Sequence, residues 1–175
     1  MKLTRRHPAT SNQRPATLES GFTLIELLIV LSIIIVIMLL AIPQVTTMKK
    51  KANQTSAVQS LRTLSSAEMG YHDPYQTYGC PIAVLGGDPH AGAPSAQAAQ
   101  LIPPDLATGI KSGYLFTVTC GSKTTANNQD VYNSVEIVAV PQTIGKTGDD
   151  GFCDDENGII KIDPAGGTNC TLPLQ

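Results

Sequence analysis

The stretch that decides the fold is GFTLIELLIVLSIIIVIMLLAI, residues 21–42. The 21 residues from 22 to 42 include only three polar side chains, those of Thr23, Glu26 and Ser32. As a helix with a rise of about 1.5 Å per residue, this run spans roughly 30 Å, which is the thickness of a bilayer's hydrocarbon core. The run is too long for a secretory signal peptide, and no Ala-x-Ala cleavage site follows it. We therefore expect a retained membrane anchor.

Basic residues flank the anchor on both sides. Lys2, Arg5, Arg6 and Arg14 precede it, and three lysines follow it at 49–51, so the count places the N-terminus inside the cell. The first 21 residues carry a net charge of +3, and the rest of the chain carries −5, from 8 basic and 13 acidic residues. Proteins that bind nucleic acid usually present a basic face, so we predict no nucleic-acid partner.

The composition excludes two further classes of protein. Hydrophobic residues make up 42% of the 175 residues, charged residues 15% and aromatic residues 5%, and tryptophan is absent. The chain is too apolar for a charge-rich disordered polymer and too poor in charge for a coiled coil. Its length fits one domain.

All four cysteines follow the anchor, and none forms a Cys-x-x-Cys pair. They are Cys80, Cys120, Cys153 and Cys170. An even number of cysteines in a domain outside the cytoplasm indicates two disulfides, with three possible connectivities. Four buried free thiols are the alternative. The disulfide interpretation places the residues beyond about 45 in an oxidising compartment.

Glu26 is the anomaly of the anchor, because a carboxylate in hydrocarbon costs several kcal/mol unless it finds a partner or reaches the interface. It lies five residues after Gly21, which separates a polar leader from the apolar run. A cut after Gly21 would create an amine on Phe22 at the start of a helix, where the dipole disfavours positive charge. Glu26 would offset that charge, or would pair with the Phe22 amine of a neighbouring subunit and set the stagger between them.

The string from Gly21 to Val30, GFTLIELLIV, resembles the cleavage and methylation signature of type IV prepilins and of the related type II secretion pseudopilins. The resemblance implies that a prepilin peptidase cuts between Gly21 and Phe22 and methylates the new amine. It also implies that Glu26 serves methylation and subunit register, and that Pro43 kinks the helix. One departure is the leader of 21 residues, which is long beside the short leaders of many members.

The segment after the anchor has the pattern of one helix followed by strands. Apolar residues recur at helical spacing up to Gly70, and the sequence Tyr71-His72-Asp73-Pro74 should end the helix. A short helix is expected over 95–102, with Ser95 as its cap. Branched and aromatic residues predict strands over 114–120 and 134–140.

A further hairpin is predicted near the C-terminus. Its strands are 151–153 and 159–162, and Asn157-Gly158 supplies the turn signal between them. Together with the long helix, these strands predict an α+β fold that resembles the pilin fold, in which a long N-terminal transmembrane helix packs on a small antiparallel β-sheet. The expected division of the chain is a cytoplasmic leader at 1–21, the long helix at 22–70 with its membrane-spanning part at 22–42, a variable loop at 71–112, and a sheet with a disulfide-bounded end at 113–175.

The spacing of the cysteines leaves the disulfide connectivity open. Many pilins have a C-terminal region bounded by a disulfide, so the resemblance favours the pairing of Cys153 with Cys170, and of Cys80 with Cys120.

Five acidic residues near the C-terminus raise the question of calcium. Asp149, Asp150, Asp154, Asp155 and Glu156 could ligate this hard cation, and major pseudopilins use calcium in this part of the chain. The spacing fits no EF-hand loop, however, and Asp and Asn beside Gly are what a hairpin turn requires. We favour the turn and expect no metal or other cofactor, with calcium as the alternative.

No motif predicts an enzyme. Gly145-Lys146-Thr147 is similar to the end of a P-loop, but the glycine needed five positions earlier is Val140. The histidines, His7, His72 and His90, make no zinc set, and no Gly-x-Ser-x-Gly elbow is present.

The expected function is therefore that of a structural subunit of a type IV pilus-like filament. Its expected partners are copies of itself, prepilin peptidase, an inner-membrane assembly platform and, before assembly, membrane lipid. It would be a single-pass inner-membrane protein with its C-terminal domain in the periplasm, and then part of a filament. The alternatives are a type II secretion pseudopilin and a non-polymerising anchored periplasmic domain. The family's uses include adhesion, twitching motility, DNA uptake and secretion, and the sequence does not choose among them.

Overall fold

A computed structural model describes residues 21–126 and 129–174, without the side chains of residues 40–43, 126 and 129. The chain divides into two compact units, which meet between Leu40 and Ala41 and are described separately. One helix, α1 (Leu24–Tyr75), contributes to both units. No single described helix is long and apolar enough to cross a membrane, whereas Leu24–Leu39 and Gln44–Tyr75, which meet at a bend, could do so together by length and composition.

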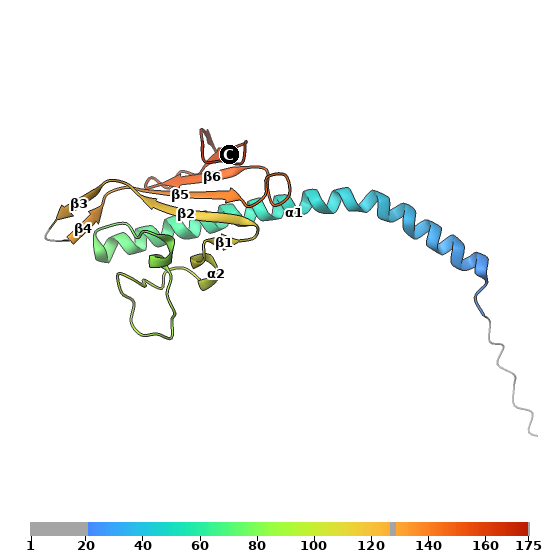
Figure 1. Cartoon of the computed structure of the whole chain (residues 1–175), viewed down its shortest axis with the longest axis horizontal. Coiled ribbons are helices and arrows are strands. Elements are labelled where there is room, and N and C mark those ends of the chain that lie inside the picture. Colours follow the sequence, from blue (N-terminus) through green and yellow to red (C-terminus); the bar gives the residue numbers. More distant parts are fainter. Residues whose placement is uncertain (1–20, 127–128, 175) are drawn as a thin grey trace, which may run out of the picture. The chain divides into compact units, whose positions relative to one another are not determined.

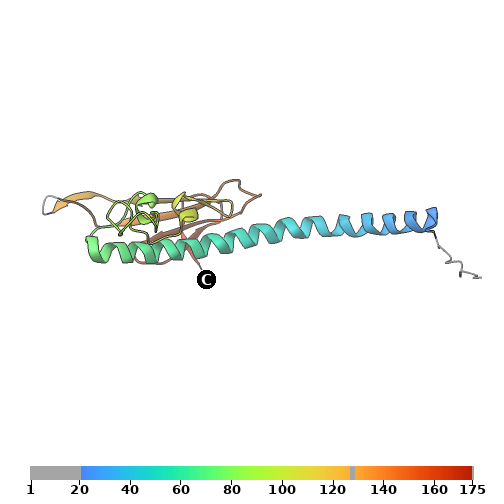
Figure 2. The same cartoon turned by 90° about the horizontal axis from the view of Figure 1, so that it is seen from below.

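In the second unit, α1 contributes an apolar stripe to the core. Ala57, Leu61, Leu64, Ala67 and Tyr71 are buried, and they recur every three or four residues, so they share one face of the helix. This face lies along one side of a β-sheet (Figure 2). Burial of each large apolar side chain of this kind stabilises the fold by roughly 1.5–3 kcal/mol.

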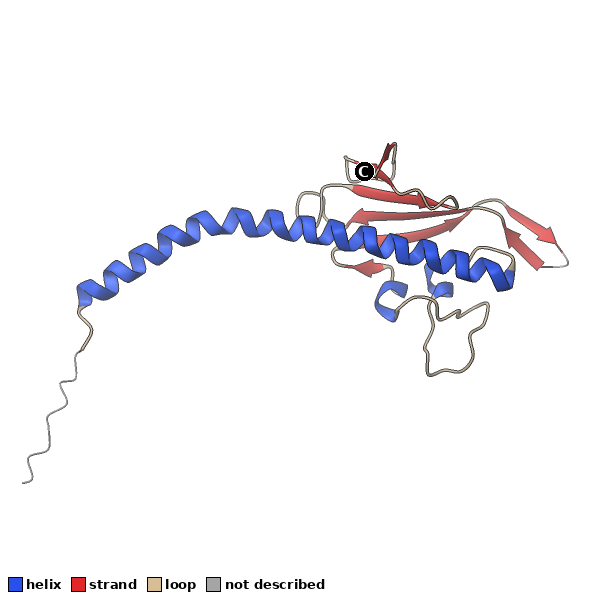
Figure 3. Ribbon diagram, turned by 180° about the vertical axis from the view of Figure 1, so that it is seen from behind, coloured by secondary structure: helices blue, strands red, loops and turns tan. Residues whose placement is uncertain are grey.

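The sheet has six antiparallel strands in the order β1-β2-β5-β6-β7-β8. Figure 1 labels β1, β2, β5 and β6 of this sheet. A separate hairpin, β3 with β4, is inserted between β2 and β5 and projects from the end of the sheet (Figures 1 and 3). The strands are β1 Ile110–Lys111, β2 Tyr114–Cys120, β3 Lys123–Ala126, β4 Gln129–Tyr132, β5 Val135–Pro141, β6 Gly151–Asp155, β7 Lys161–Asp163 and β8 Leu172–Pro173.

The two longest strands alternate buried and exposed side chains, as the sequence predicts for a half-buried sheet. In β2 the buried positions begin with Tyr114 and Phe116, and in β5 they begin with Val135 and Ile137. The predicted turn at Asn157-Gly158 is also present between β6 and β7. Gly158 has φ +70 there, a conformation that favours glycine. The α+β pilin-like fold is thus confirmed.

The helix predicted over 95–102 is wrong. Ser95 and Ala98 form an isolated antiparallel bridge, and Gln100 has φ +56. The backbone N–H groups of residues 99–101 donate to the carbonyls of residues 84–86, so tertiary pairing replaces the local helix. The short helices of this region lie elsewhere, at η1 (Ile82–Leu85) and α2 (Pro104–Ala107).

The long helix also runs to Tyr75 rather than ending at Gly70. Tyr71 explains the extension, because its ring is buried and its hydroxyl donates to the Ala96 carbonyl at 2.8 Å. Pro74 lies in the last turn, so its missing N–H removes a single intrahelical hydrogen bond, the one to the Gly70 carbonyl. The side chain of Pro43, where a kink is predicted, is outside the described residues, and so is the leader from residue 1 to 20. The kink and the leader therefore stay predictions.

Candidate functional site

The candidate site begins where α1 begins. Thr23 immediately precedes the helix, and its Oγ1 accepts a hydrogen bond from the backbone N–H of Glu26 at 3.2 Å. The Thr23 carbonyl also accepts from the N–H of Leu27 at 3.2 Å. Thr23 is therefore the N-cap, which sequence reasoning missed. The signal was present, since Thr-x-x-Glu is the pattern of a capping box.

Glu26 lies in the first turn of α1, where the helix dipole favours a negative charge. Within the described part of the chain, no basic side chain pairs with it. Ser32, the other polar residue of this helical segment, donates its hydroxyl to the Ile29 carbonyl at 2.7 Å and is thereby satisfied. Glu26 is thus the one carboxylate of this apolar segment, and its charge has no basic partner within the described part of the chain.

The described side chains of the first unit, residues 22–39, present an apolar surface on every side of the helix. Phe22 and Leu24 are 85% and 84% exposed, and every described side chain up to Leu39 is exposed. A helix that is apolar all round requires lipid or protein around it. The predicted site residues Gly21, Phe22 and Glu26 therefore lie at the N-terminal end of a segment built for burial outside its own chain.

A second cluster of polar contacts fixes the β5–β6 loop, residues 142–150, to α1. Lys50 Nζ lies 2.8 and 2.9 Å from the two carboxylate oxygens of Asp149. Asn53 donates to the Thr147 carbonyl at 2.8 Å, and Gln54 donates to Asp150 Oδ2 at 2.9 Å. The lysines at 49–51 were considered above only as charges that flank the anchor, so these contacts between α1 and the loop were not predicted.

The polar contacts of the β5–β6 loop continue into the core at Tyr114. Its ring is fully buried, and its hydroxyl donates to the backbone carbonyl of Asp150 at 2.9 Å. Gly148 packs against the ring so closely that a Cβ there would overlap the Tyr114 hydroxyl. Desolvation raises the pKa of the Asp150 carboxyl, and the nearby charge of Asp149 raises it further.

The four aspartates considered for calcium separate into two pairs at opposite ends of β6. Asp149 and Asp150 are held by α1, as described above. Asp154 is buried beside the Ser65 hydroxyl, and burial raises the pKa of its carboxyl. Asp155 accepts from Lys161 Nζ at 3.3 Å. Among the described residues, no group of three or more His, Cys, Asp or Glu side chains is placed to hold a metal ion.

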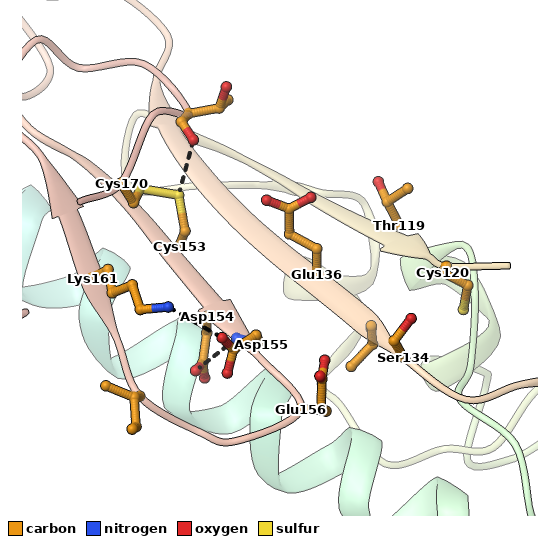
Figure 4. A pocket seen from close by; sticks show the side chains of 14 residues that line it. Thr119, Cys120, Ser134, Glu136, Cys153, Asp154, Asp155, Glu156, Lys161 and Cys170 are labelled. Atoms are coloured by element: carbon orange, nitrogen blue, oxygen red, sulfur yellow. Dashed lines mark hydrogen bonds and ion pairs between the residues drawn. A yellow bond between two sulfur atoms is a disulfide. The ribbon is translucent and has the colours of Figure 1, made fainter.

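Two disulfides cross-link the second unit, which is called the head below. Their pairing is the one that the resemblance favours. Cys80–Cys120 joins the loop after α1 to the end of β2, and Cys153–Cys170 joins β6 to the C-terminal tail. Both lie beside a cleft of about 320 Å³ on the outer face of the sheet (Figure 4). Its charged lining consists of Glu136, Asp154, Asp155, Glu156 and Lys161, and no histidine lines it. The cysteines that line it are oxidised in the two disulfides, so none of them is a free thiol.

The comparisons with known proteins bear on the N-terminal segment. Residues 17–42 match the family model described as the prokaryotic N-terminal methylation motif. No curated protein and no solved structure matches the chain. The motif indicates a membrane-anchored, structural role of the pilin or pseudopilin type. The chain therefore carries the type IV pilin and pseudopilin signature, at the start of an α+β pilin-like fold.

Proposed function

We propose that this protein is a structural subunit of a type IV pilus-like filament. A prepilin peptidase cuts after Gly21 and methylates the Phe22 amine. The subunit then resides in the inner membrane with its head in the periplasm, until an assembly platform adds it to the filament. The observation that carries the proposal is an apolar helix whose one carboxylate, Glu26, has no basic partner among the described residues and lies five residues after the glycine at which the motif is cut.

Burial of the apolar segment against copies of itself replaces lipid contact with protein contact. This exchange gives little hydrophobic driving force, because lipid tails are as apolar as leucine side chains. A charge pair between Glu26 of one subunit and the Phe22 amine of its neighbour is the interaction that favours one arrangement of the subunits over others. Leaving either charge unpaired inside the filament is strongly unfavourable, so the pair also fixes the stagger between subunits.

The head is suited to a compartment outside the cytoplasm. Its two disulfides close the loop after α1 and the C-terminal tail, and disulfides persist in oxidising compartments such as the periplasm. Within this unit, the Lys50–Asp149 pair joins the β5–β6 loop to α1.

A second candidate function is that of a pseudopilin in a type II secretion system, because the same N-terminal motif serves both classes. The two functions differ in the location of the filament. A pilus subunit appears in material sheared from the cell surface, whereas a secretion pseudopilus stays short and periplasmic. A domain that never polymerises would give neither product.

The test is substitution of Glu26, with Ser32 as the matched control. Both are polar side chains of the same apolar segment, but the Ser32 hydroxyl is satisfied by its own helix. We expect Glu26→Ala to insert in the membrane and to be lost from filaments, and Ser32→Ala to enter filaments normally. Carbonate extraction measures insertion, and immunoblotting of sheared or cross-linked filament fractions measures incorporation. Wild-type incorporation of Glu26→Ala would remove the pairing argument.

A further inference from the structure

Glu68 is an acidic side chain in the core of the head. It lies on the inward face of α1, one turn after Leu64, and is 1% exposed. Its Oε2 accepts a hydrogen bond from the backbone N–H of Gly79 at 2.8 Å. Its Oε1 is buried and has no hydrogen-bond partner among the described residues. A buried carboxylate with an unsatisfied oxygen is costly when ionised and much less costly when protonated.

No basic side chain of the described residues pairs with Glu68. A cavity of about 10 Å³ borders it, with Ser65 and Met69 of α1, Tyr78 of the next loop, Val135 and Ile137 of β5, and Asp155 and Glu156 of the β6–β7 turn. β5 contributes only apolar groups here, and the turn contributes carboxylates. The remaining titratable or charged groups nearby are Tyr71, the buried Asp154, Lys161, which is paired with Asp155, and His72, whose ring lies against Tyr78.

We propose that Glu68 is a proton-controlled latch between the end of α1 and the loop 76–80. When protonated, it stays buried and retains the Gly79 hydrogen bond. When ionised, it favours an open state in which the carboxylate reaches water and the loop leaves α1. This inference concerns the head alone and does not depend on filament assembly.

The sign of the pH dependence follows from burial. Desolvation raises the pKa of Glu68 from 4.5 to about 7, and the Gly79 N–H opposes part of that rise. The closed state therefore binds a proton more tightly than an open state with an ordinary carboxyl pKa. The pKa difference stabilises the closed state to its full extent below about pH 4.5. This stabilisation declines as the pH rises and is lost above about pH 7.

The loop 76–80 is hydrogen-bonded to the base of the projecting β3–β4 hairpin. The N–H of Tyr78 donates to the Tyr132 carbonyl at 3.3 Å, and the N–H of Tyr132 donates to Thr77 Oγ1 at 2.8 Å. Tyr132 is the last residue of β4, and the β3–β4 hairpin projects from the end of the sheet (Figure 1). Opening of the loop therefore loosens the attachment of the β3–β4 hairpin. External pH would set the mobility of this exposed element.

Hydrogen exchange of the Gly79 amide tests the latch. It is measured by NMR on the full-length chain in detergent micelles from pH 4.5 to 8, and expressed as protection relative to the intrinsic rate at each pH. We expect protection to fall by up to about 300-fold between pH 4.5 and 7 and to level off above, since each unit of pKa difference is tenfold. The Tyr132 amide should follow the same profile.

Two variants assign the effect to Glu68. Glu68→Gln should remove the pH dependence, and Glu156→Gln, an exposed carboxylate at the same cavity, should retain it. A wild-type profile that is flat over this range, or an unchanged fall in Glu68→Gln, would overturn the proposal. If Glu68→Gln does not fold, the carboxyl carbon shift of Glu68 in the wild type decides. A midpoint near 7 supports the latch, and one near 4.5 overturns it.

Discussion

The two disulfides should stabilise the head unequally, because they close loops of different length. Cys153 and Cys170 are separated by 17 residues, and Cys80 and Cys120 by 40. In the chain-entropy model, the shorter loop contributes about 3 kcal/mol at 25 °C and the longer about 4 kcal/mol. We therefore expect Cys153→Ser/Cys170→Ser to lower the free energy of unfolding by about 3 kcal/mol, and Cys80→Ser/Cys120→Ser to lower it by about 1 kcal/mol more.

Urea unfolding of the full-length chain in detergent measures these differences. The chain has no tryptophan and five tyrosines, all in the second unit, so tyrosine near-UV circular dichroism reports on the head alone. The comparison requires equal denaturant slopes, because removal of a cross-link also expands the unfolded state. A loss below about 1 kcal/mol for both double variants would refute the loop-closure argument. A larger loss for the 17-residue loop would show that contacts of the tail outweigh chain entropy.

Two further substitutions test the packing of the head. Leu64→Ala should destabilise the head by about 2–5 kcal/mol, because Leu64 is fully buried between α1 and the sheet, whereas Thr63→Ala on the exposed face should change stability by less than about 0.5 kcal/mol. Equal losses in thermal unfolding would contradict the assignment of faces. Lys50→Met should cost less than about 1 kcal/mol, since the two side chains of the Lys50–Asp149 pair are 22% and 50% exposed and solvent screens the pair. A double-mutant cycle with Asp149→Asn isolates the coupling, and a value well above 1 kcal/mol would mean that the pair acts as a buried one.

Local pattern was sufficient for much of the fold. The alternation of buried and exposed side chains in β2 and β5, and the Asn157-Gly158 turn, are encoded by neighbouring residues. The helix expected over 95–102 is absent because distant carbonyls, those of residues 84–86, take its backbone donors. The long helix passes Gly70 because Tyr71 finds a buried site, and no local pattern encodes that contact.

The functional residues likewise divide into those that a local motif predicts and those that only the fold brings together. Gly21, Phe22 and Glu26 belong to one short motif, and the Thr23 cap could have been found from the same string. The Lys50–Asp149 pair could not, because its partners are 99 residues apart. Glu68 left one signal, a carboxylate one turn after Leu64 on the apolar stripe of α1. Its unpaired oxygen depends on β5 and the loop at Gly79, which only the folded chain brings together.

The most direct test of the central claim is mass spectrometry of the N-terminal peptide of the native protein. Prepilin processing predicts a chain that begins at Phe22 with a methylated amine. A chain that still begins at Met1, in cells with an active prepilin peptidase, would contradict the account. In that case Glu26 would be only a tolerated charge, and an anchored domain that does not polymerise would be the better description.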